Sequence, residues 1–243
     1  MPVSNRIDIP ESAVAIDLNF APITGVNGKV YKGTYGGATV AVKMPLFKAG
    51  ESEQTQQQKR DDLAKDSEFL RSVNSSLFPV YKGEGRRRDP DPASVVQTSE
   101  AVYTEFLGGQ SLARMGMAQA RALDGVKKKK ILKDCLLALK TLHGLGISHG
   151  DIQTGNVMFD TATNVTKVID FGKATRRKVG NDIYGVTAEE LAKSMNDDMH
   201  RFSFIAVFLD ITDERLKPVL AKCSCTSKER ITSDAAWKAL EDW

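Results

Sequence analysis

The sequence predicts an α+β fold, with a β-rich first part followed by a helical second part. Residues 23–43 are rich in glycine, valine, tyrosine and threonine, and "YGG" separates two extended runs, a pattern typical of a β-hairpin. The segment "KKKKILKDCLLALKTLHGLG" (127–146) instead repeats apolar residues on one helical face and ends at glycine. Because the character changes near Leu107 and 243 residues can bury two small cores, we expect two lobes.

Composition and charge exclude several classes of protein. The chain is 41% hydrophobic and 27% charged, as expected of a soluble globular protein. Its formal net charge of +3 lacks the basic excess of a nucleic-acid binder. No apolar run is long enough to span a bilayer, and the first residues lack a cleavable secretory signal. Since an odd set of three cysteines favours a reducing compartment, we expect a soluble, cytoplasmic protein. We also expect a monomer with no nucleic-acid partner and no membrane span.

The remaining elements follow in order along the chain. Residues 51–73 are polar with apolar residues at helical spacing, which predicts one exposed helix that ends at "NSS". "GEGRRRDPDPAS" (83–94) predicts a loop between strands, and "AVYTEFL" (101–107) predicts a short strand before "GGQ". Two short apolar runs, "VMF" and "VTKVI", flank the turn formers "DTATN" and predict a second hairpin.

The second hairpin is expected to gather polar residues at its open end. Its turn centres near residues 162 and 163, so Asn156 and Asp170 stand at nearly matching distances from the turn. An amide oxygen and a carboxylate placed together can hold Mg²⁺, which prefers oxygen ligands. Asp151, earlier on the same loop, is then expected to orient an attacking hydroxyl and accept its proton.

These residues resemble the catalytic segments of the protein-kinase-like superfamily. "HGDIQTGN" (149–156) resembles the catalytic loop, and "DFG" (170–172) resembles the metal-binding triplet. The resemblance implies the bilobal protein-kinase-like fold, with ATP and Mg²⁺ as nucleotide and metal. It implies catalytic roles for Asp151, Lys43 and Asn156, with Asn156 and Asp170 as metal ligands.

"ITGVNGKVYKG" (23–33) resembles the glycine-rich nucleotide loop of the same superfamily. Gly25 and Gly28 match its second and third glycines, and Val30 matches the valine that covers adenine. Ile23 stands where the first glycine is expected, which departs from the family pattern. Since small residues let backbone N–H groups approach phosphates, losing one glycine is expected to stiffen this loop or loosen its phosphate contact.

"GTYGGATVAVKMP" (33–45) resembles the strand that carries the nucleotide-binding lysine. The match puts Ala41 and Lys43 at nucleotide-binding positions, with Lys43 placed to contact the α and β phosphates. The lysine needs an acidic partner from the helix that follows. The family register puts Asp66 at that position, whereas Glu68 falls on a different face, and a solvated acid at Asp66 is the alternative.

"YTEFLGGQSL" (103–112) resembles the segment that links the two lobes. The resemblance implies Thr104 as gatekeeper, with Glu105 to Leu107 offering backbone hydrogen bonds to adenine. It divides the chain into an N-terminal arm at 1–20 and a kinase domain at 21–243. Within that domain, the N-lobe covers about 21–103, the hinge 104–110 and the C-lobe 111–243.

Two resemblances concern residues that would support the catalytic segments. "DDMHRFSFIAVFLD" (197–210) resembles the central helix of the C-lobe, where Asp198 would cap the catalytic-loop backbone. "AEE" (188–190) is a degraded match to the motif that closes the activation segment, which implies a pair between Glu190 and Arg230.

Three activities remain open at this point. Motif agreement favours a protein kinase that phosphorylates a protein hydroxyl, with serine or threonine favoured over tyrosine. Gly150 in place of the usual arginine is common in small-molecule phosphotransferases of the aminoglycoside or choline kinase type, which are the second candidate. A binding-only pseudokinase is the third, and the set Lys43, Asp151, Asn156 and Asp170 argues against it.

The short connections and degraded closing motif also resemble small kinases that bacteria deliver into eukaryotic hosts by type III secretion. That resemblance implies an effector role in virulence and a host signalling or chaperone protein as the substrate. It would make residues 1–20 an uncleaved secretion signal for delivery into the host cytosol.

Overall fold

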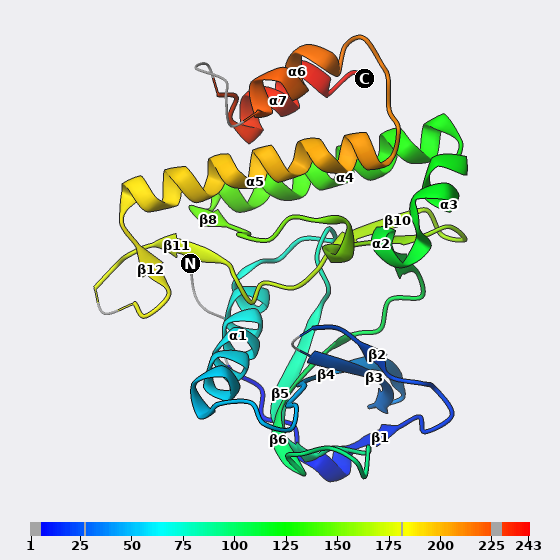
Figure 1. Cartoon of the computed structure of the whole chain (residues 1–243), viewed down its shortest axis with the longest axis vertical. Coiled ribbons are helices and arrows are strands. Elements are labelled where there is room, and N and C mark those ends of the chain that lie inside the picture. Colours follow the sequence, from blue (N-terminus) through cyan, green and yellow to red (C-terminus); the bar gives the residue numbers. More distant parts are fainter. Residues whose placement is uncertain (1–5, 27, 181, 225–229) are drawn as a thin grey trace. The chain divides into compact units, whose positions relative to one another are not determined.

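The computed structural model of the chain describes residues 6–26, 28–180, 182–224 and 230–243. Two compact units divide the chain: Met1–Asn74 with Pro79–Leu107, and Ser75–Phe78 with Gly108–Trp243. The first unit is built around a curled β-sheet and the second around helices, so the predicted α+β class is confirmed (Figure 1). Among the described residues, no helix is both long and apolar enough to cross a membrane.

A six-stranded antiparallel sheet forms the first unit. Its strands run in the order β1-β3-β4-β6-β5, and β2 pairs with β3. Tyr31, Val42 and Tyr103 are buried in its core, because alternate residues of a strand face the same side. The strands are β1 (Val14–Ile16), β2 (Ile23–Thr24), β3 (Gly28–Tyr35), β4 (Ala38–Pro45), β5 (Tyr81–Arg88) and β6 (Thr98–Glu105).

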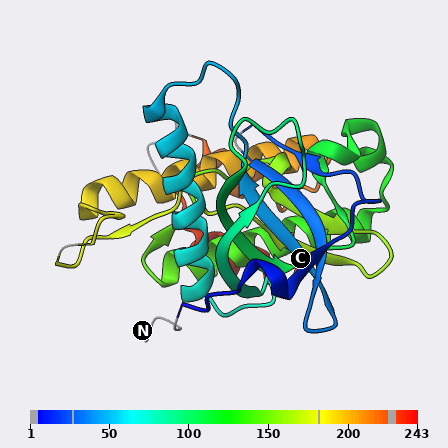
Figure 2. The same cartoon turned by 90° about the horizontal axis from the view of Figure 1, so that it is seen from below.

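Helix α1 (Glu53–Ser72) packs along this sheet (Figure 2). It begins at Ser52, whose hydroxyl accepts a hydrogen bond from the backbone N–H of Thr55 and so satisfies one unpaired helix-start group. Leu63, Phe69 and Leu70 are buried on one face. The predicted helix at 51–73 is therefore confirmed to within two residues at each end.

The predicted loop at 83–94 is wrong for its first half, because β5 continues through "GEGRRR" to Arg88. The N-terminal segment lies along this strand, where Ile9 N–H donates to the Glu84 carbonyl at 2.8 Å. That approach needs glycine, since a Cβ at Gly85 would lie 2.3 Å from the Ile9 carbonyl oxygen. The glycines that suggested a loop thus allow a neighbouring segment to lie close to a strand.

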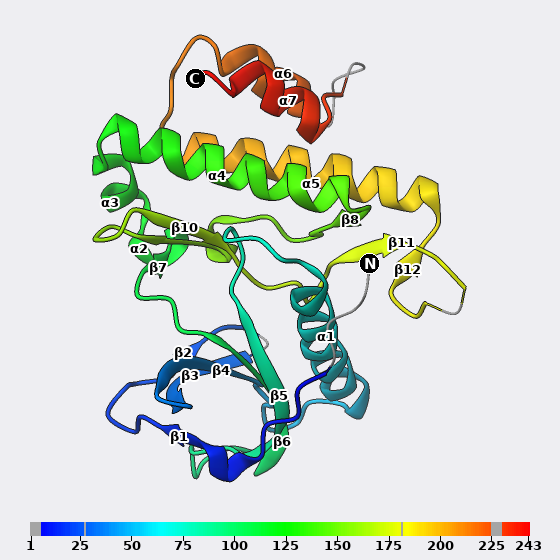
Figure 3. The same cartoon turned by 180° about the vertical axis from the view of Figure 1, so that it is seen from behind.

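Helices α4 (Gly125–Gly144) and α5 (Ala188–Phe208) lie side by side in the second unit, and α7 (Ser233–Leu240) packs on α4 (Figure 3). The apolar face of α4 predicted from the sequence is buried, including Leu132, Cys135 and Leu139. Cys135 and Cys223 are free buried thiols, whereas Cys225 lies outside the described residues. The other helices are α2 (Leu112–Met115), α3 (Met117–Ala122) and α6 (Lys217–Cys223).

Short strands lie between these helices along the chain. The predicted second hairpin is confirmed as β9 (Val157–Asp160) and β10 (Val165–Val168), which pair from Val157 opposite Val168 to Asp160 opposite Val165. One sheet has the order β10-β9-β7 and another β12-β11-β8. The remaining strands are β7 (Gln110–Ser111), β8 (Ile147–Ser148), β11 (Thr175–Arg177) and β12 (Gly185–Val186).

Candidate active site

The predicted site residues fall into two groups, one in each unit. The first unit carries the positions expected to bind nucleotide: Gly25, Gly28, Val30, Ala41, Lys43, Asp66, Thr104, Glu105 and Leu107. The second unit carries Asp151, Asn156 and Asp170, the residues expected to act on the acceptor hydroxyl and the metal.

Neighbouring strands bring most of the first group together. Val30 on β3 lies opposite Lys43 on β4, and Ala41 on β4 lies opposite Thr104 on β6. Directly opposed residues in antiparallel strands have side chains on the same face of the sheet. These four positions therefore share one region of the sheet, although they are far apart in the sequence.

The glycine-rich segment forms a tight turn between β2 and β3. The backbone N–H of Gly25 donates to the Gly28 carbonyl at 2.8 Å, which closes the turn. A Cβ at Gly28 would lie 3.1 Å from the Met44 carbonyl oxygen, so this position is tightly packed against β4. Asn27 lies outside the described residues.

Lys43 and Asp66 form an ion pair in the first unit. The Lys43 ammonium lies 2.8 Å from Oδ2 of Asp66, which projects from the buried face of α1. The Asp66 side chain is 4% exposed, whereas that of Lys43 is 26% exposed, so the carboxylate is the buried member of the pair. The pair fixes the lysine on β4 relative to the helix, and aspartate is long enough to reach it.

Asp198 organises the catalytic-loop segment of the second unit. Its buried carboxylate accepts backbone N–H bonds from His149 at 2.8 Å and Gly150 at 2.9 Å. Ser148 and His143 also donate to it, at 2.7 and 3.1 Å. Burial alone would raise the pKa of Asp198, but the hydrogen bonds from His143 and Ser148, together with the nearby His149, outweigh it and lower the pKa. The predicted capping of the loop backbone by Asp198 is confirmed.

His149 joins the catalytic loop to the "DFG" segment. Its Nδ1 accepts the backbone N–H of Asp151 at 3.3 Å, so the proton is on Nε2, which lies 3.1 Å from the Ile169 carbonyl. Burial lowers the pKa of His149 and keeps the ring neutral, as this tautomer requires. The buried Phe171 ring packs against His149, with the ring centroids 5.1 Å apart.

These contacts position Asp170 in an uncommon backbone conformation. Its φ is +69°, a left-handed value that costs energy for a residue with a Cβ, although aspartate tolerates it better than most. The backbone N–H of Ile169 donates to the Asn156 carbonyl at 2.9 Å, so the residue before Asp170 is hydrogen-bonded to Asn156. The hairpin thus brings the two predicted metal ligands to neighbouring positions.

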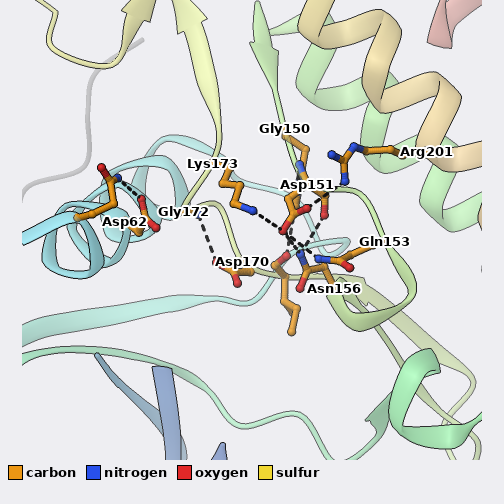
Figure 4. A network of polar contacts seen from close by, with 12 residues as sticks. Asp62, Gly150, Asp151, Gln153, Asn156, Asp170, Gly172, Lys173 and Arg201 are labelled. Carbon is orange, nitrogen blue, oxygen red and sulfur yellow. Dashed lines mark hydrogen bonds and ion pairs between the residues drawn. The ribbon is translucent and has the colours of Figure 1, made fainter. Parts of the chain in front are cut away.

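The Asp151 carboxylate lies in a polar network within the second unit (Figure 4). Its Oδ2 accepts from Gln153 at 3.0 Å and from the Asn156 amide at 3.3 Å, while the same amide donates to the Asp151 carbonyl at 2.9 Å. Two cations also reach it: Lys173 lies 3.6 Å from Oδ2, and Arg201 on α5 lies 3.2 Å from Oδ1.

Sequence reasoning missed both cations. For Arg201 a signal was available, because it follows Asp198 by three positions and residues at that helical spacing are neighbours. Once Asp198 is taken to cap the loop, Arg201 is expected near it. Lys173 has a weaker signal, namely its place directly after "DFG".

Gly150 cannot be replaced by a larger residue without moving its neighbour. Its φ is +76°, and a Cβ there would lie 2.3 Å from the Lys173 carbonyl oxygen. The loop backbone therefore packs directly against the segment after "DFG". The arginine missing from this position has no room in this conformation.

The segment between "DFG" and α5 corresponds to the activation segment of the resemblance, and contacts between its own residues hold it. Arg176 makes two hydrogen bonds to Asp182, one of them from Nη2 to Oδ1 at 3.0 Å, and the N–H of Tyr184 also donates to Asp182. Hydrogen bonding from Arg176 lowers the pKa of Asp182. The Arg176–Asp182 pair is therefore fully formed above about pH 4, the ordinary pKa of an aspartate. It is lost only as the pH falls through the lowered pKa of Asp182.

The predicted pair between Glu190 and Arg230 is wrong for the described part of the chain. The Glu190 carboxylate instead accepts the backbone N–H and the hydroxyl of Thr187, each at 2.9 Å. The backbone N–H of Glu190 in turn donates to the Thr187 hydroxyl oxygen, which completes a capping box at the start of α5. Because α5 begins at residue 188, the acid is used to cap this helix.

The sequence-family model described as the protein kinase domain matches residues 24–193 of the chain. The chain belongs to the protein kinase family. This assignment agrees with the two-unit architecture, with the Lys43–Asp66 pair and with the loop that Asp198 holds. Kinases of this family use ATP and a divalent metal ion and act on proteins.

Several known kinases are similar to this kinase over part of their length. Dual specificity protein kinase pyk3 of Dictyostelium discoideum is 26% identical over 198 residues, covering 77% of this chain and 13% of that protein. A probable LIM domain-containing serine/threonine-protein kinase of the same organism is 26% identical over 189 residues, covering 70% of this chain and 16% of that protein. Serine/threonine-protein kinase pim-2 of Danio rerio is 40% identical over 57 residues, covering 24% of this chain and 18% of that protein. The aligned segments span less than a fifth of each relative.

The oxygen donors of this kinase fit a hard divalent cation. The Asp151 carbonyl can only accept a hydrogen bond, so the amino group of Asn156 faces it and turns the amide oxygen away. In the described ranges, no three His, Cys, Asp or Glu side chains gather as a metal site. A site of one amide and one carboxylate suits Mg²⁺, which completes its shell with water and phosphate oxygens.

Proposed function

We propose that the chain is an ATP- and Mg²⁺-dependent protein kinase that phosphorylates serine or threonine hydroxyls of a protein substrate. The main support is the Asp151 network, in which a carboxylate is held beside Asn156 and its loop is fixed by the buried Asp198. The names of the relatives, serine/threonine and dual specificity kinases, favour this substrate class.

The reaction assigns a separate task to each unit. Lys43, held by Asp66, would bind the α and β phosphates, and the sheet positions around Val30 and Thr104 would bind adenine. Asp151 would orient the acceptor hydroxyl and accept its proton as the oxygen–phosphorus bond forms. The bond from the γ-phosphorus to the β–γ bridging oxygen breaks, and ADP leaves. Mg²⁺ on Asn156 and Asp170 would neutralise phosphate charge.

We expect Lys43→Ala to lower phosphoryl transfer by on the order of 10²-fold or more, because a positive charge is lost from the phosphates and Asp66 is left buried without this partner. Initial rates at several ATP concentrations would measure the loss. Lys48→Ala is the matched control, since Lys48 is an exposed lysine of the same unit. An unchanged rate for Lys43→Ala would show that the proposed nucleotide-binding role is wrong.

We also expect the enzyme to be active without phosphorylation of its activation segment. Asp182 already supplies the carboxylate that pairs with Arg176, and Gly150 removes the arginine that would anchor an added phosphate. Activity would be compared before and after phosphatase treatment, with mass spectrometry confirming unmodified Thr175, Tyr184 and Thr187. A large loss that returns on rephosphorylation would contradict this expectation.

A small-molecule phosphotransferase is the second candidate, and the favouring observation is "HGD" with its glycine packed against the Lys173 carbonyl. The purified chain would be incubated with γ-labelled ATP and Mg²⁺, alongside mixed lysate proteins or small alcohols and amines that include choline and an aminoglycoside. Labelled phosphoserine or phosphothreonine supports the protein kinase, and labelled small molecules support the alternative. Nucleotide binding without labelling of either would indicate a pseudokinase.

We further propose, from the sequence resemblance alone, a monomer that acts as a type III effector on a host signalling or chaperone protein. Residues 1–20 would carry the delivery signal. Fusion of these residues to a reporter would test this in bacteria with and without a functional secretion apparatus. Equal export from both strains, or export from neither, would refute delivery.

A further inference from the structure

One face of α5 is exposed and carries both apolar and charged residues. Phe204 and Val207 are 56% and 62% exposed, although burying such side chains stabilises a fold. Arg201 precedes Phe204 by three positions, and its side chain is 46% exposed. At 100° per residue, these three side chains fall on one side of the helix, which we call the α5 face.

Arg201 connects the α5 face to the proposed proton acceptor. Its Nη1 donates to Oδ1 of Asp151 at 3.2 Å, so the arginine of this face lies beside that carboxylate (Figure 4). Arg201 is also available to other anions, because a guanidinium has five N–H donors and this contact uses one.

The two oxygens of Asp151 are not equivalent. Oδ2 already accepts hydrogen bonds from Gln153 and Asn156 and lies near Lys173, whereas Oδ1 takes its hydrogen bond from Arg201. Since a carboxylate oxygen offers about two lone-pair sites, an acceptor hydroxyl would bind at Oδ1. The acceptor residue would then lie next to Arg201.

We propose that the α5 face binds the protein substrate beside its phosphorylated hydroxyl. Arg201 would pair with an aspartate or glutamate close to the acceptor residue, and Phe204 with Val207 would pack against a large apolar residue farther along the same segment. The inference rests on the proposed kinase function and adds a substrate class, namely an acidic and apolar protein segment. Arg201 acts here as a positioning and specificity residue.

A peptide library with one serine or threonine and a single varied flanking position tests the proposal. We expect the unaltered chain to select acidic residues at one position and large apolar residues at another. Arg201→Glu should reverse the charge preference toward lysine and arginine, and Arg201→Lys should keep the acidic preference. Phe204→Ser should weaken the apolar preference by about ten-fold and leave the acidic one, because each contact serves one substrate residue. Val126→Ser is the matched control, since Val126 is an exposed valine on α4.

The outcomes distinguish a failure of this inference from a failure of the proposed kinase function. If the unaltered chain labels no peptide and no lysate protein, the kinase function itself fails. If it labels peptides but Arg201→Glu keeps the original charge preference, the role of the α5 face is overturned and the kinase function stands. Size-exclusion chromatography adds a third outcome: a dimer that Phe204→Ser converts to monomer, with peptide selection unchanged, would make this face an interface between two copies.

Discussion

Asp170→Ala is expected to abolish metal-dependent ATP binding and to lower phosphoryl transfer by on the order of 10³-fold or more. Asp170 is the charged member of the proposed metal pair, and a neutral Asn156 amide cannot replace its charge. Its position is also fixed structurally, because Phe171 is buried beside His149 and Ile169 is hydrogen-bonded to Asn156. Calorimetric titration with ATP, with and without Mg²⁺, would measure the binding loss.

A second variant separates charge from backbone conformation. Because φ at Asp170 is +69°, alanine also removes a residue type that tolerates the left-handed region, whereas asparagine tolerates it as aspartate does. Asp170→Asn is therefore expected to lose metal-dependent binding while its thermal unfolding stays unchanged. Asp61→Ala, at an exposed carboxylate on α1, is the control. Full activity in Asp170→Asn would remove Asp170 from the proposed metal site.

Asp151→Asn is expected to lower phosphoryl transfer by about 10² to 10⁴-fold while ATP and Mg²⁺ still bind. An asparagine keeps an acceptor oxygen for Arg201 and much of the local hydrogen bonding, but it cannot take the proton of the acceptor hydroxyl. The effect should therefore appear in kcat rather than in the nucleotide dissociation constant. Single-turnover rates and calorimetry on the same sample would separate the two.

The control for this variant is Asp61→Asn, which makes the same chemical change at an exposed site of the first unit. Loss of nucleotide binding in Asp151→Asn would reassign Asp151 to a structural or metal-binding role. A rate within a few-fold of the unaltered chain would show that another group accepts the proton.

Local patterns in the sequence predicted most of the elements. Helices α1 and α4 follow from apolar residues at helical spacing, and the β9–β10 hairpin follows from two short apolar runs around turn formers. These features depend on neighbours a few residues away, so one sequence is enough to find them. The same hairpin also predicted that Asn156 and Asp170 lie close together, because residues at similar distances from a turn are opposite each other in the paired strands.

The two differences have different causes, one a contact between distant segments and the other a local contact at a helix start. "GEGRRR" has the composition of a loop, yet it forms part of β5 because it pairs with the distant strand β6, and its glycines let Ile9 lie close to that strand. Glu190 was expected to pair with Arg230, but its place three residues after Thr187 lets it cap α5 instead. In both cases the packing of another segment, or the start of a helix, determined how the residue is used.

The sequence by itself determined the α+β class, the order of the main elements and the residue types that identify a protein kinase. Only the tertiary structure decided that Asp66 is paired with Lys43, that His149 links the catalytic loop to "DFG", and that Arg201 and Lys173 reach Asp151. The physical reason is the range of the interactions. Helix and strand patterns arise from adjacent residues, whereas an ion pair across 23 or 50 residues depends on how separately formed elements pack.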